Sequence, residues 1–465
     1  MSLQFIIGSS GIGKTYYACE QIIRESMENP QHLYYIIVPE QFTMQTQKNV
    51  VEMHPGKGIL NIDVLSFQRL AYRIFEETGG AREVLLDDTG KSMVLQKLVQ
   101  QHRKNLPYLG SQMNKPGYLD EVKSLISEFM QYDIREEELQ DMLGKTGEDS
   151  LLHMKMQDVG VLYQAFLQYL EGHYMTGEGV MDALKKAIPF SDKLKKSVLL
   201  LDGFTGFTPV QMNVIRELLN VCDKVLVTVT MDAGENPLQL GKPHQLFYMS
   251  RKMIHTLSGL TSNLDDPVLL KDERKGRFGN STSLDFLEKH LFRYRRSAYE
   301  KKQEEICIFA AESPVKELEE TARRIRRLVR EKNLKYGEIA VITGNLEAYK
   351  SIASQVFEES RIPYFLDEKH TILMNPFIEY IRAALEMVTK GFSYESVFRY
   401  LRCDMSGLGR EQVDMLENYV LALGIHGYKK WSEKWVRVYR TMDPEDIQVP
   451  VSYTHLRAHE TAANL

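Results

Sequence analysis

A phosphate-binding loop is the first feature of the sequence that could do chemistry. Residues 8–15 read Gly-Ser-Ser-Gly-Ile-Gly-Lys-Thr, which fits the pattern G-x-x-x-x-G-K-[ST]. In such a loop, backbone N–H groups at a helix N-terminus converge on phosphate oxygens, a lysine adds positive charge, and a hydroxyl holds Mg²⁺. The sequence therefore predicts that ATP and Mg²⁺ bind at Gly8, Ser9, Ser10, Gly11, Ile12, Gly13, Lys14 and Thr15.

Hydrolysis of a bound nucleotide needs two further groups. One is a carboxylate at the end of a neighbouring strand for Mg²⁺, and the other orients or deprotonates the attacking water. Asp202 follows the apolar run 198–201 and is the predicted Mg²⁺ ligand, together with Thr15. The next residue is Gly203, where a motor ATPase usually has glutamate. We therefore expect nucleotide binding without efficient turnover and assign no catalytic residue, so whether this chain alone is an enzyme stays open.

Alternating strands and helices must position these residues. Strands are predicted at residues 3–7, 34–38, 62–65, 197–202 and 224–230, with helices at 16–27 and 67–77. The order strand, helix, strand indicates a crossover unit of a parallel sheet. The pattern over about 87–186 is helical, which predicts an all-helical insertion, and the first α/β domain is expected to span 1–285.

A second α/β domain is expected at residues 286–450. Its predicted strands, 306–309 and 338–342, flank a predicted helix at 315–332, and the domain is expected to be incomplete. The composition of residues 451–465 does not continue that domain. These residues resemble a translated sequencing adapter, so they are expected to be a foreign tail.

Composition limits the class of protein. The formal net charge of −5 argues against a protein that coats DNA through bulk charge. Neither a signal peptide nor an apolar run of spanning length is apparent, which predicts a cytoplasmic location without membrane partners. The four cysteines lie far apart without C-x-x-C spacing, so they are expected to be buried thiols rather than disulfide or zinc ligands.

Several segments resemble superfamily 1 helicases. Residues 38–43 and 63–75 resemble DNA-contacting motifs, and residues 313–327, 336–342 and 361–367 resemble the opening of the second motor-like domain of UvrD-type helicases. The departures narrow this resemblance. Gly203 replaces the catalytic glutamate, residues 227–232 replace the G-D-x-x-Q-S sensor, and residues 342–345 lack the usual arginine. With these departures the chain resembles the AddB family, the B subunits of bacterial ATP-dependent helicase/deoxyribonucleases (AddAB).

This resemblance implies a fold and a function. The implied fold is α/β, with two RecA-like (P-loop, superfamily 1 helicase-like) parallel-sheet domains, helical insertions and a truncated second domain. The implied function is the N-terminal part of a subunit that pairs with an AddA-like motor. The heterodimer would resect DNA double-strand breaks for recombinational repair, acting on double-stranded DNA and scanning the single strand for Chi. An iron–sulfur cluster and a nuclease metal are implied for the full-length family, but without ligands in this chain.

The resemblance also suggests DNA contacts. Candidates for binding single-stranded DNA through stacking, polar contacts and charge are Gln41, Thr43, Phe67, Arg69, Tyr72 and Phe207. The alternative is that Phe67 and Tyr72 are core residues of an amphipathic helix and that Arg69 is merely solvated. The run 323–330 is arginine-rich, but glutamates one to two turns earlier favour a salt-bridged helix face.

Other functions remain open at this stage. The first is a self-sufficient superfamily 1 DNA helicase, which Gly203 and the lost sensor segment disfavour. The second is a P-loop kinase for a small molecule, which the expected second α/β domain disfavours. A pure scaffold is a third.

Overall fold

The computed structural model describes residues 2–435, apart from 81–82, 114, 116, 148–149, 233, 272–275, 294–296 and 369–371. The chain divides into two compact units, Met1–Ile308 and Phe309–Leu465, which we call the first and second units. Helix α12 (Thr282–His290) therefore belongs with the first unit, although the sequence places the domain boundary at 285/286. The predicted foreign tail, 451–465, lies outside the described residues.

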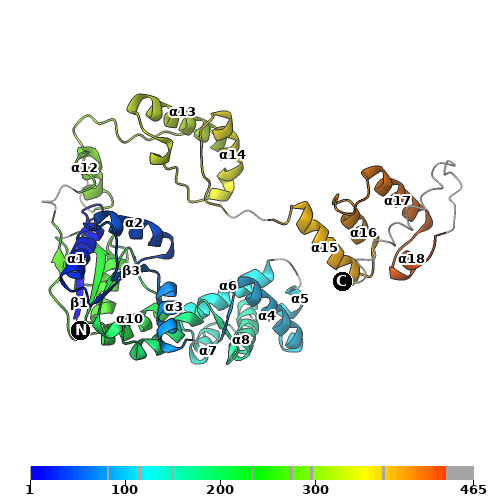
Figure 1. Ribbon diagram of the computed structural model, residues 1–465, viewed down its shortest axis with the longest axis horizontal. Coiled ribbons are helices and arrows are strands. Elements are labelled where there is room, and N and C mark those ends of the chain that lie inside the picture. Colours follow the sequence, from blue (N-terminus) through cyan, green and yellow to red (C-terminus); the bar gives the residue numbers. More distant parts are fainter. Residues whose placement is uncertain are drawn as a thin grey trace. The chain divides into compact units, whose positions relative to one another are not determined.

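A six-stranded parallel sheet forms the centre of the first unit (Figure 1). Its strand order is β3-β2-β6-β7-β1-β8, and every neighbouring pair runs parallel. The strands are β1 (Ser2–Gly8), β2 (Leu33–Ile37), β3 (Ile62–Leu65), β6 (Ser197–Leu201), β7 (Lys224–Thr230) and β8 (Val268–Leu269). Their nearly continuous apolar runs arise because both faces of a parallel sheet are covered by helices. The predicted α/β class and the parallel sheet are thereby confirmed, and among the strands of this sheet β8 alone was not predicted.

Helices cover both faces of this sheet. Helices α1 (Lys14–Glu28) and α2 (Thr43–Met53) contribute to the buried cluster on one face. The opposite face packs against α3 (Phe67–Thr78), α9 (Gly179–Ala187), α10 (Pro209–Val221) and α11 (Tyr248–Ser258). Side chains alternate along a strand, so β7 sends Leu226 to the α1 side, whereas Val225 and Val227 join the other cluster.

The helical insertion has a buried cluster of its own, but the range 87–186 is not all-helical as predicted, since residues 174–176 form a strand and helix α9 packs against the central sheet (Figure 1). It consists of α4 (Asp88–Gln101), α5 (Leu109–Gln112), α6 (Tyr118–Gln131), α7 (Glu136–Gly144) and α8 (Leu151–Leu170). A short parallel pair, β4 (Val84–Leu86) and β5 (Tyr174–Thr176), brings its two ends together. The Lys91 ammonium lies 2.9 Å from the Glu178 carboxylate, and the side chains are only 7% and 11% exposed. This buried ion pair ties α4 to the start of α9.

In the second unit, α13 (Pro314–Lys332) packs against α14 (Leu346–Glu359). The predicted strands 306–309 and 338–342 are wrong for this structure, since neither segment pairs with any described residue. Ile308 and Ile342 are 94% and 92% exposed. A strand forms only where neighbouring backbone groups can complete its hydrogen bonds, and apolar sequence alone does not provide them.

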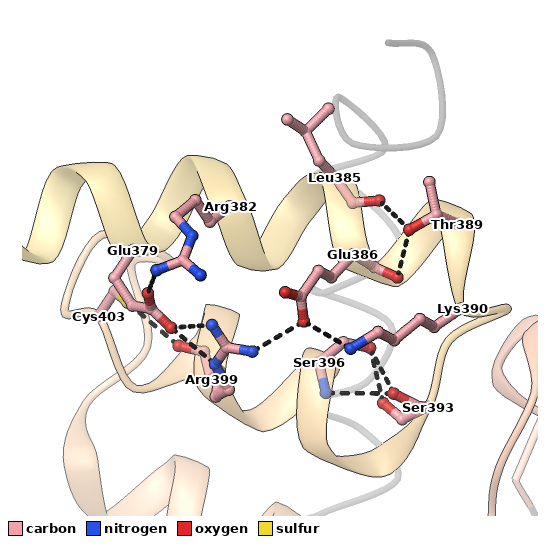
Figure 2. A network of polar contacts seen from close by, with 10 residues as sticks. All are labelled: Glu379, Arg382, Leu385, Glu386, Thr389, Lys390, Ser393, Ser396, Arg399 and Cys403. Atoms are coloured by element: carbon pink, nitrogen blue, oxygen red, sulfur yellow. Dashed lines mark hydrogen bonds and ion pairs between the residues drawn. The ribbon is translucent and has the colours of Figure 1, made fainter. Parts of the chain in front are cut away.

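Up to residue 435 the described chain continues with helices α15 (Pro376–Thr389), α16 (Tyr394–Leu401), α17 (Arg410–Leu423) and α18 (Tyr428–Ser432). Figure 2 shows how α15 and α16 are joined by charge. The Arg399 guanidinium donates to Glu379 at 2.6 Å and to Glu386 at 2.7 Å, two carboxylates on α15. Because they lie two turns apart on one helix face, the pairing sets how α16 lies along α15. This network orients helices and presents no reactive group.

The arginine-rich stretch of α13 is a salt-bridged helix face, as predicted. Glu320 accepts hydrogen bonds from Arg323 at 2.7 Å and from Arg324 at 3.0 Å, one turn along the helix. Ile325 is buried against α14. Each such pair contributes about 0.3–0.5 kcal/mol.

The prediction that all four cysteines are buried is wrong for Cys307, which is exposed, and Cys403 is only partly buried. Cys307 lies in the segment 306–309, which lacks the expected strand partners. Burial raises the pKa of Cys19 to about 12 and that of Cys222 to about 11, so both thiols stay protonated and unreactive.

Candidate nucleotide-binding site

The phosphate-binding loop connects β1 to α1 at the carboxyl edge of the sheet (Figure 1). Gly11 and Gly13 adopt φ of +76° and +96°, a left-handed conformation that favours glycine. Gly13 is the N-cap residue of α1, and no side chain from the described residues caps this helix end. The first N–H groups of α1 therefore remain available to an anion, as a phosphate site requires.

Lys14 lies at the first position of α1, and its ammonium donates a hydrogen bond to the Ser9 carbonyl at 2.8 Å. Burial lowers the pKa of Lys14, while the nearby carboxylates of Asp202 and Glu288 act in the opposite direction. Arg277 adds a second positive charge nearby, which also lowers this pKa. A partly desolvated ammonium at the N-terminus of a helix is suited to a polyanion.

Asp202 and Thr15, the two side chains predicted to bind Mg²⁺, are in contact. The Thr15 hydroxyl lies 3.0 Å from each carboxylate oxygen of Asp202. Asp202 directly follows β6 and is 5% exposed. A second hydroxyl, that of Thr228 on β7, donates to Asp202 Oδ1 at 2.6 Å. Hydroxyl and carboxylate oxygens are hard ligands of the kind Mg²⁺ prefers, so this donor set fits the ion.

Gly203 stands where a motor ATPase has glutamate, and its backbone conformation disfavours that residue. Gly203 has φ +78°, which side-chain-bearing residues rarely adopt. A Cβ added at position 203 would lie 3.7 Å from Pro39 Cδ, an ordinary van der Waals distance. Other residues are therefore disfavoured here by the backbone φ and not by a clash with neighbouring side chains. Glutamate at this position would strain the backbone, and the chain instead turns sharply after Asp202.

A cavity of about 780 Å³ opens beside the loop. Its walls come from α1, α2 and the residues after β6, and include Lys14, Thr15, Phe42, Gln45, Asn49, Asp202 and Arg277. This volume is typical of small-molecule sites. Sequence reasoning missed the α2 wall, although Gln45 and Asn49 lie four residues apart and so share one helix face. A larger cavity of about 970 Å³ is lined by α3, α8 and α9 and includes none of the loop residues.

A segment far along the chain lies against the loop, and the sequence did not predict it. The Arg277 N–H donates to the Gly11 carbonyl at 2.8 Å. From α12, Glu288 Oε1 accepts a hydrogen bond from the Ser10 N–H at 3.3 Å. Burial raises the pKa of Glu288. In this structure an internal carboxylate therefore occupies one of the loop donors that a phosphate would use.

The six candidate DNA contacts differ in exposure. Gln41, Arg69 and Tyr72 are exposed, Phe207 is partly buried, and Thr43 and Phe67 are buried. The Phe67 ring packs 5.6 Å from Phe204 and 6.3 Å from Phe207, measured between centroids. Phe67 therefore has the core position of the alternative interpretation, and it offers no free face to a base here.

The polar candidates have local partners. Arg69 Nε donates to Glu40 Oε1 at 3.1 Å, and both side chains are more than half exposed. The Thr43 hydroxyl donates to the Glu40 carbonyl at 2.9 Å. Gln41, Arg69 and Tyr72 remain accessible to a ligand, and their contact with DNA stays a prediction.

Two absences apply to the described parts of the chain. There, no helix is both long and apolar enough to cross a bilayer. Over the same residues, no group of three or more His, Cys, Asp or Glu side chains is arranged to hold a metal ion.

The parallel sheet, the loop after β1 and the carboxylate after β6 define a P-loop protein of the RecA-like class. Comparison with known families is more specific. The family described as "ADDB, N-terminal" matches residues 5–288, and the "UvrD-like helicase C-terminal domain" matches residues 279–440. The chain belongs to the AddB N-terminal family.

Three similar proteins are each named as the B subunit of an ATP-dependent helicase/deoxyribonuclease. The chain is 42% identical over 456 residues to that of Lachnoclostridium phytofermentans, covering 96% of this chain and 40% of the relative. It is 34% identical over 440 residues to that of Clostridium novyi, covering 94% and 38%. For Caldanaerobacter subterraneus subsp. tengcongensis the identity is 35% over 439 residues, covering 94% and 37%. The chain thus spans about 40% of the length of these relatives.

Proposed function

We propose that the phosphate-binding loop binds ATP with Mg²⁺ and retains it as a structural or regulatory ligand. The observation that carries this proposal is a contrast between binding and catalytic groups. Lys14, Thr15 and Asp202 converge on one site, with distances of 2.8–3.0 Å among the loop and carboxylate atoms. The position after Asp202 is Gly203, whose left-handed backbone disfavours the glutamate that would activate water.

The chain's own residues would divide the work of binding. The first N–H groups of α1 and the Lys14 ammonium hold the phosphates, while Thr15 and Asp202 hold the ion. When bound, Mg²⁺ supplies positive charge that neutralises the phosphate oxygens. The wall of the cavity formed by Phe42, Gln45 and Asn49 lies beside this loop and would contact the part of the nucleotide beyond the phosphates.

We further propose that the chain is the N-terminal part of a B subunit in a heterodimeric ATP-dependent helicase/exonuclease. Its partner would be an AddA-like motor, acting in the cytoplasm on DNA double-strand breaks for recombinational repair. Family membership and the shared name of the relatives support this proposal. Nuclease and iron–sulfur chemistry would then lie in the part of the relatives that this chain does not span.

Single-stranded DNA would cross the first unit beside α3 and the segment after β2, where it would be scanned for Chi. Support comes from the exposed side chains of Gln41, Arg69 and Tyr72, which offer an amide, a charge and an aromatic face. In this proposal the rings of Phe67 and Phe204 pack together and hold the partly buried ring of Phe207 in place.

The other candidate functions gain no support. A self-sufficient helicase needs the water-activating group that the Gly203 backbone disfavours. A small-molecule kinase is disfavoured by membership in the AddB family.

Equilibrium binding of a fluorescent ATP analogue with Mg²⁺ tests the nucleotide site. Lys14→Ala removes the ammonium while leaving the loop glycines and α1 intact. The expected loss of affinity is about 10- to 100-fold, because a hydrogen bond to a charged group contributes ~1.5–3 kcal/mol. Lys97→Ala, an exposed lysine of the helical insertion outside the cavity, is the control and should bind like wild type. Absence of binding by folded wild type would overturn the proposal.

A further inference from the structure

Strand β7 carries one buried hydroxyl among aliphatic neighbours. Thr228 is 5% exposed, whereas the strand residues on either side of it, Val227 and Val229, are buried in the apolar cluster of the opposite sheet face. Alternation therefore directs Thr228 to the α1 side, together with Leu226. Valine has nearly the same shape as threonine, and a buried hydroxyl is unfavourable unless it has a partner. Packing alone thus gives no reason for threonine at this position.

The register of the sheet places this hydroxyl beside Asp202. Leu201, the last residue of β6, pairs with Val227 of β7. The residues that follow them, Asp202 and Thr228, therefore lie beside each other. On its other side Thr228 pairs with Ile6 of β1, two residues before the loop begins at Gly8. Thr228 consequently lies between the strand that carries the carboxylate and the strand that carries the phosphate loop.

The hydrogen bonds of Thr228 have a defined direction. Its oxygen accepts from the Gly203 N–H at 3.4 Å and lies 2.6 Å from Asp202 Oδ1. Since an N–H can only donate, the Thr228 proton is left for the carboxylate. Asp202 Oδ1 therefore accepts this hydrogen bond, which fixes one oxygen of a carboxylate of the kind that a divalent cation binds.

Thr15 and Thr228 do not have equivalent roles. The Thr15 hydroxyl contacts both oxygens of Asp202 at 3.0 Å, but this hydroxyl is also the group that a phosphate loop offers to Mg²⁺. The Thr228 hydroxyl is buried on the strand side of Asp202, where it has no such second task. Its hydrogen bond to Asp202 does not compete with binding of the ion, whereas that of Thr15 does.

We propose that Thr228 is a positioning residue for the Mg²⁺–nucleotide site, which holds Oδ1 of Asp202 and keeps the carboxylate beside Thr15. This inference rests on the proposed nucleotide function and adds to it a residue that acts through Asp202. It predicts that loss of the Thr228 hydroxyl weakens nucleotide binding only when Mg²⁺ is present.

The experiment measures affinity for fluorescent ATP with Mg²⁺ and with EDTA, using wild type, Thr228→Val and Thr228→Ser. Thr228→Val keeps the shape and removes the hydroxyl, and Thr228→Ser keeps the hydroxyl. Thr230→Val, at the exposed end of the same strand, is the matched control. The Mg²⁺-dependent gain in affinity should fall about tenfold in Thr228→Val, as expected for one hydrogen bond to a charged group. It should be retained in Thr228→Ser and in the control, and all four proteins should agree in EDTA.

The possible outcomes separate the two proposals. If Mg²⁺ raises the nucleotide affinity of Thr228→Val as much as that of wild type, the role of Thr228 is overturned. The nucleotide site itself would still stand. Folded wild type that binds no nucleotide would overturn the site and the role of Thr228 together. If Thr228→Val does not fold, Thr228→Ala is the second hydroxyl-free variant, measured below its melting temperature beside Thr228→Ser. An equal loss with Mg²⁺ and with EDTA would indicate general damage and would overturn the inference.

Discussion

Restoring the glutamate of motor ATPases at position 203 should destabilise the protein without creating a motor. Gly203 has φ +78°, and the left-handed conformation costs a residue with a Cβ about 1–2 kcal/mol. No clash adds to this value, because the new Cβ would lie 3.7 Å from Pro39 Cδ. For a domain of this size, about 1 kcal/mol lowers the melting temperature by roughly 2–4 °C, so Gly203→Glu should melt roughly 2–8 °C lower.

Gly203→Ala separates the backbone cost from the effect of charge. Alanine carries the same conformational cost without placing a second carboxylate next to Asp202, so any further decrease in Gly203→Glu measures repulsion between the two carboxylates. Melting followed by circular dichroism gives the stability, and phosphate release with single-stranded DNA gives the activity. Gly203→Glu that melts like wild type, or that gains DNA-stimulated hydrolysis, would refute the reasoning from the Gly203 backbone.

Three further predictions concern Glu288, Lys91 and the DNA surface. Glu288→Gln should raise nucleotide affinity several-fold, because it removes a negative charge from the Ser10 N–H. Burial raises the pKa of Glu288 above 4.5. As pH rises through that higher pKa the carboxylate becomes charged, so the nucleotide affinity of wild type should fall, and that of Glu288→Gln should change less. Equal pH profiles of the two proteins would contradict this role. Lys91→Met should destabilise the helical insertion by ~3–5 kcal/mol, because it leaves Glu178 buried without its partner, and hydrogen exchange in α4 and α9 measures this; unchanged protection would contradict it. Arg69→Ala should weaken binding of a single-stranded oligonucleotide and reduce the salt dependence of that binding. Arg216→Ala on α10 is the control. Equal binding by both variants would remove this surface from the proposed path of the DNA.

The first unit could be predicted from sequence because its signals are local. The strands of its sheet are short aliphatic runs, and glycine, lysine and threonine at fixed spacing mark the loop between β1 and α1. Asp202 was found as the polar residue that ends such a run, and Thr15, which contacts it, lies 187 positions earlier in the chain. This pairing was predictable because the carboxyl ends of parallel strands meet at one edge of the sheet.

Features that depend on distant partners could not be predicted in this way. The segments 306–309 and 338–342 have strand-like composition, but a strand needs a neighbour, and sequence does not show whether one is present. The contact of Glu288 with Ser10 joins residues 278 positions apart and has no motif. Phe67 was ambiguous because an aromatic residue at the start of an amphipathic helix can face either the core or a ligand. The role of Thr228 could not be recognised from sequence, because β7 is rich in β-branched residues and threonine is common in strands for reasons of conformation alone.

The fate of bound ATP tests most directly whether this site retains its nucleotide without turning it over. Wild type and Lys14→Ala are loaded with radiolabelled ATP and Mg²⁺, incubated with single-stranded DNA, freed of unbound nucleotide, and denatured, and the released nucleotide is identified by chromatography. We predict that wild type retains intact ATP and that Lys14→Ala retains none. If the nucleotide recovered from wild type is ADP, and its amount increases when single-stranded DNA is present, the prediction is contradicted. Such a result would mean that the site hydrolyses ATP despite Gly203.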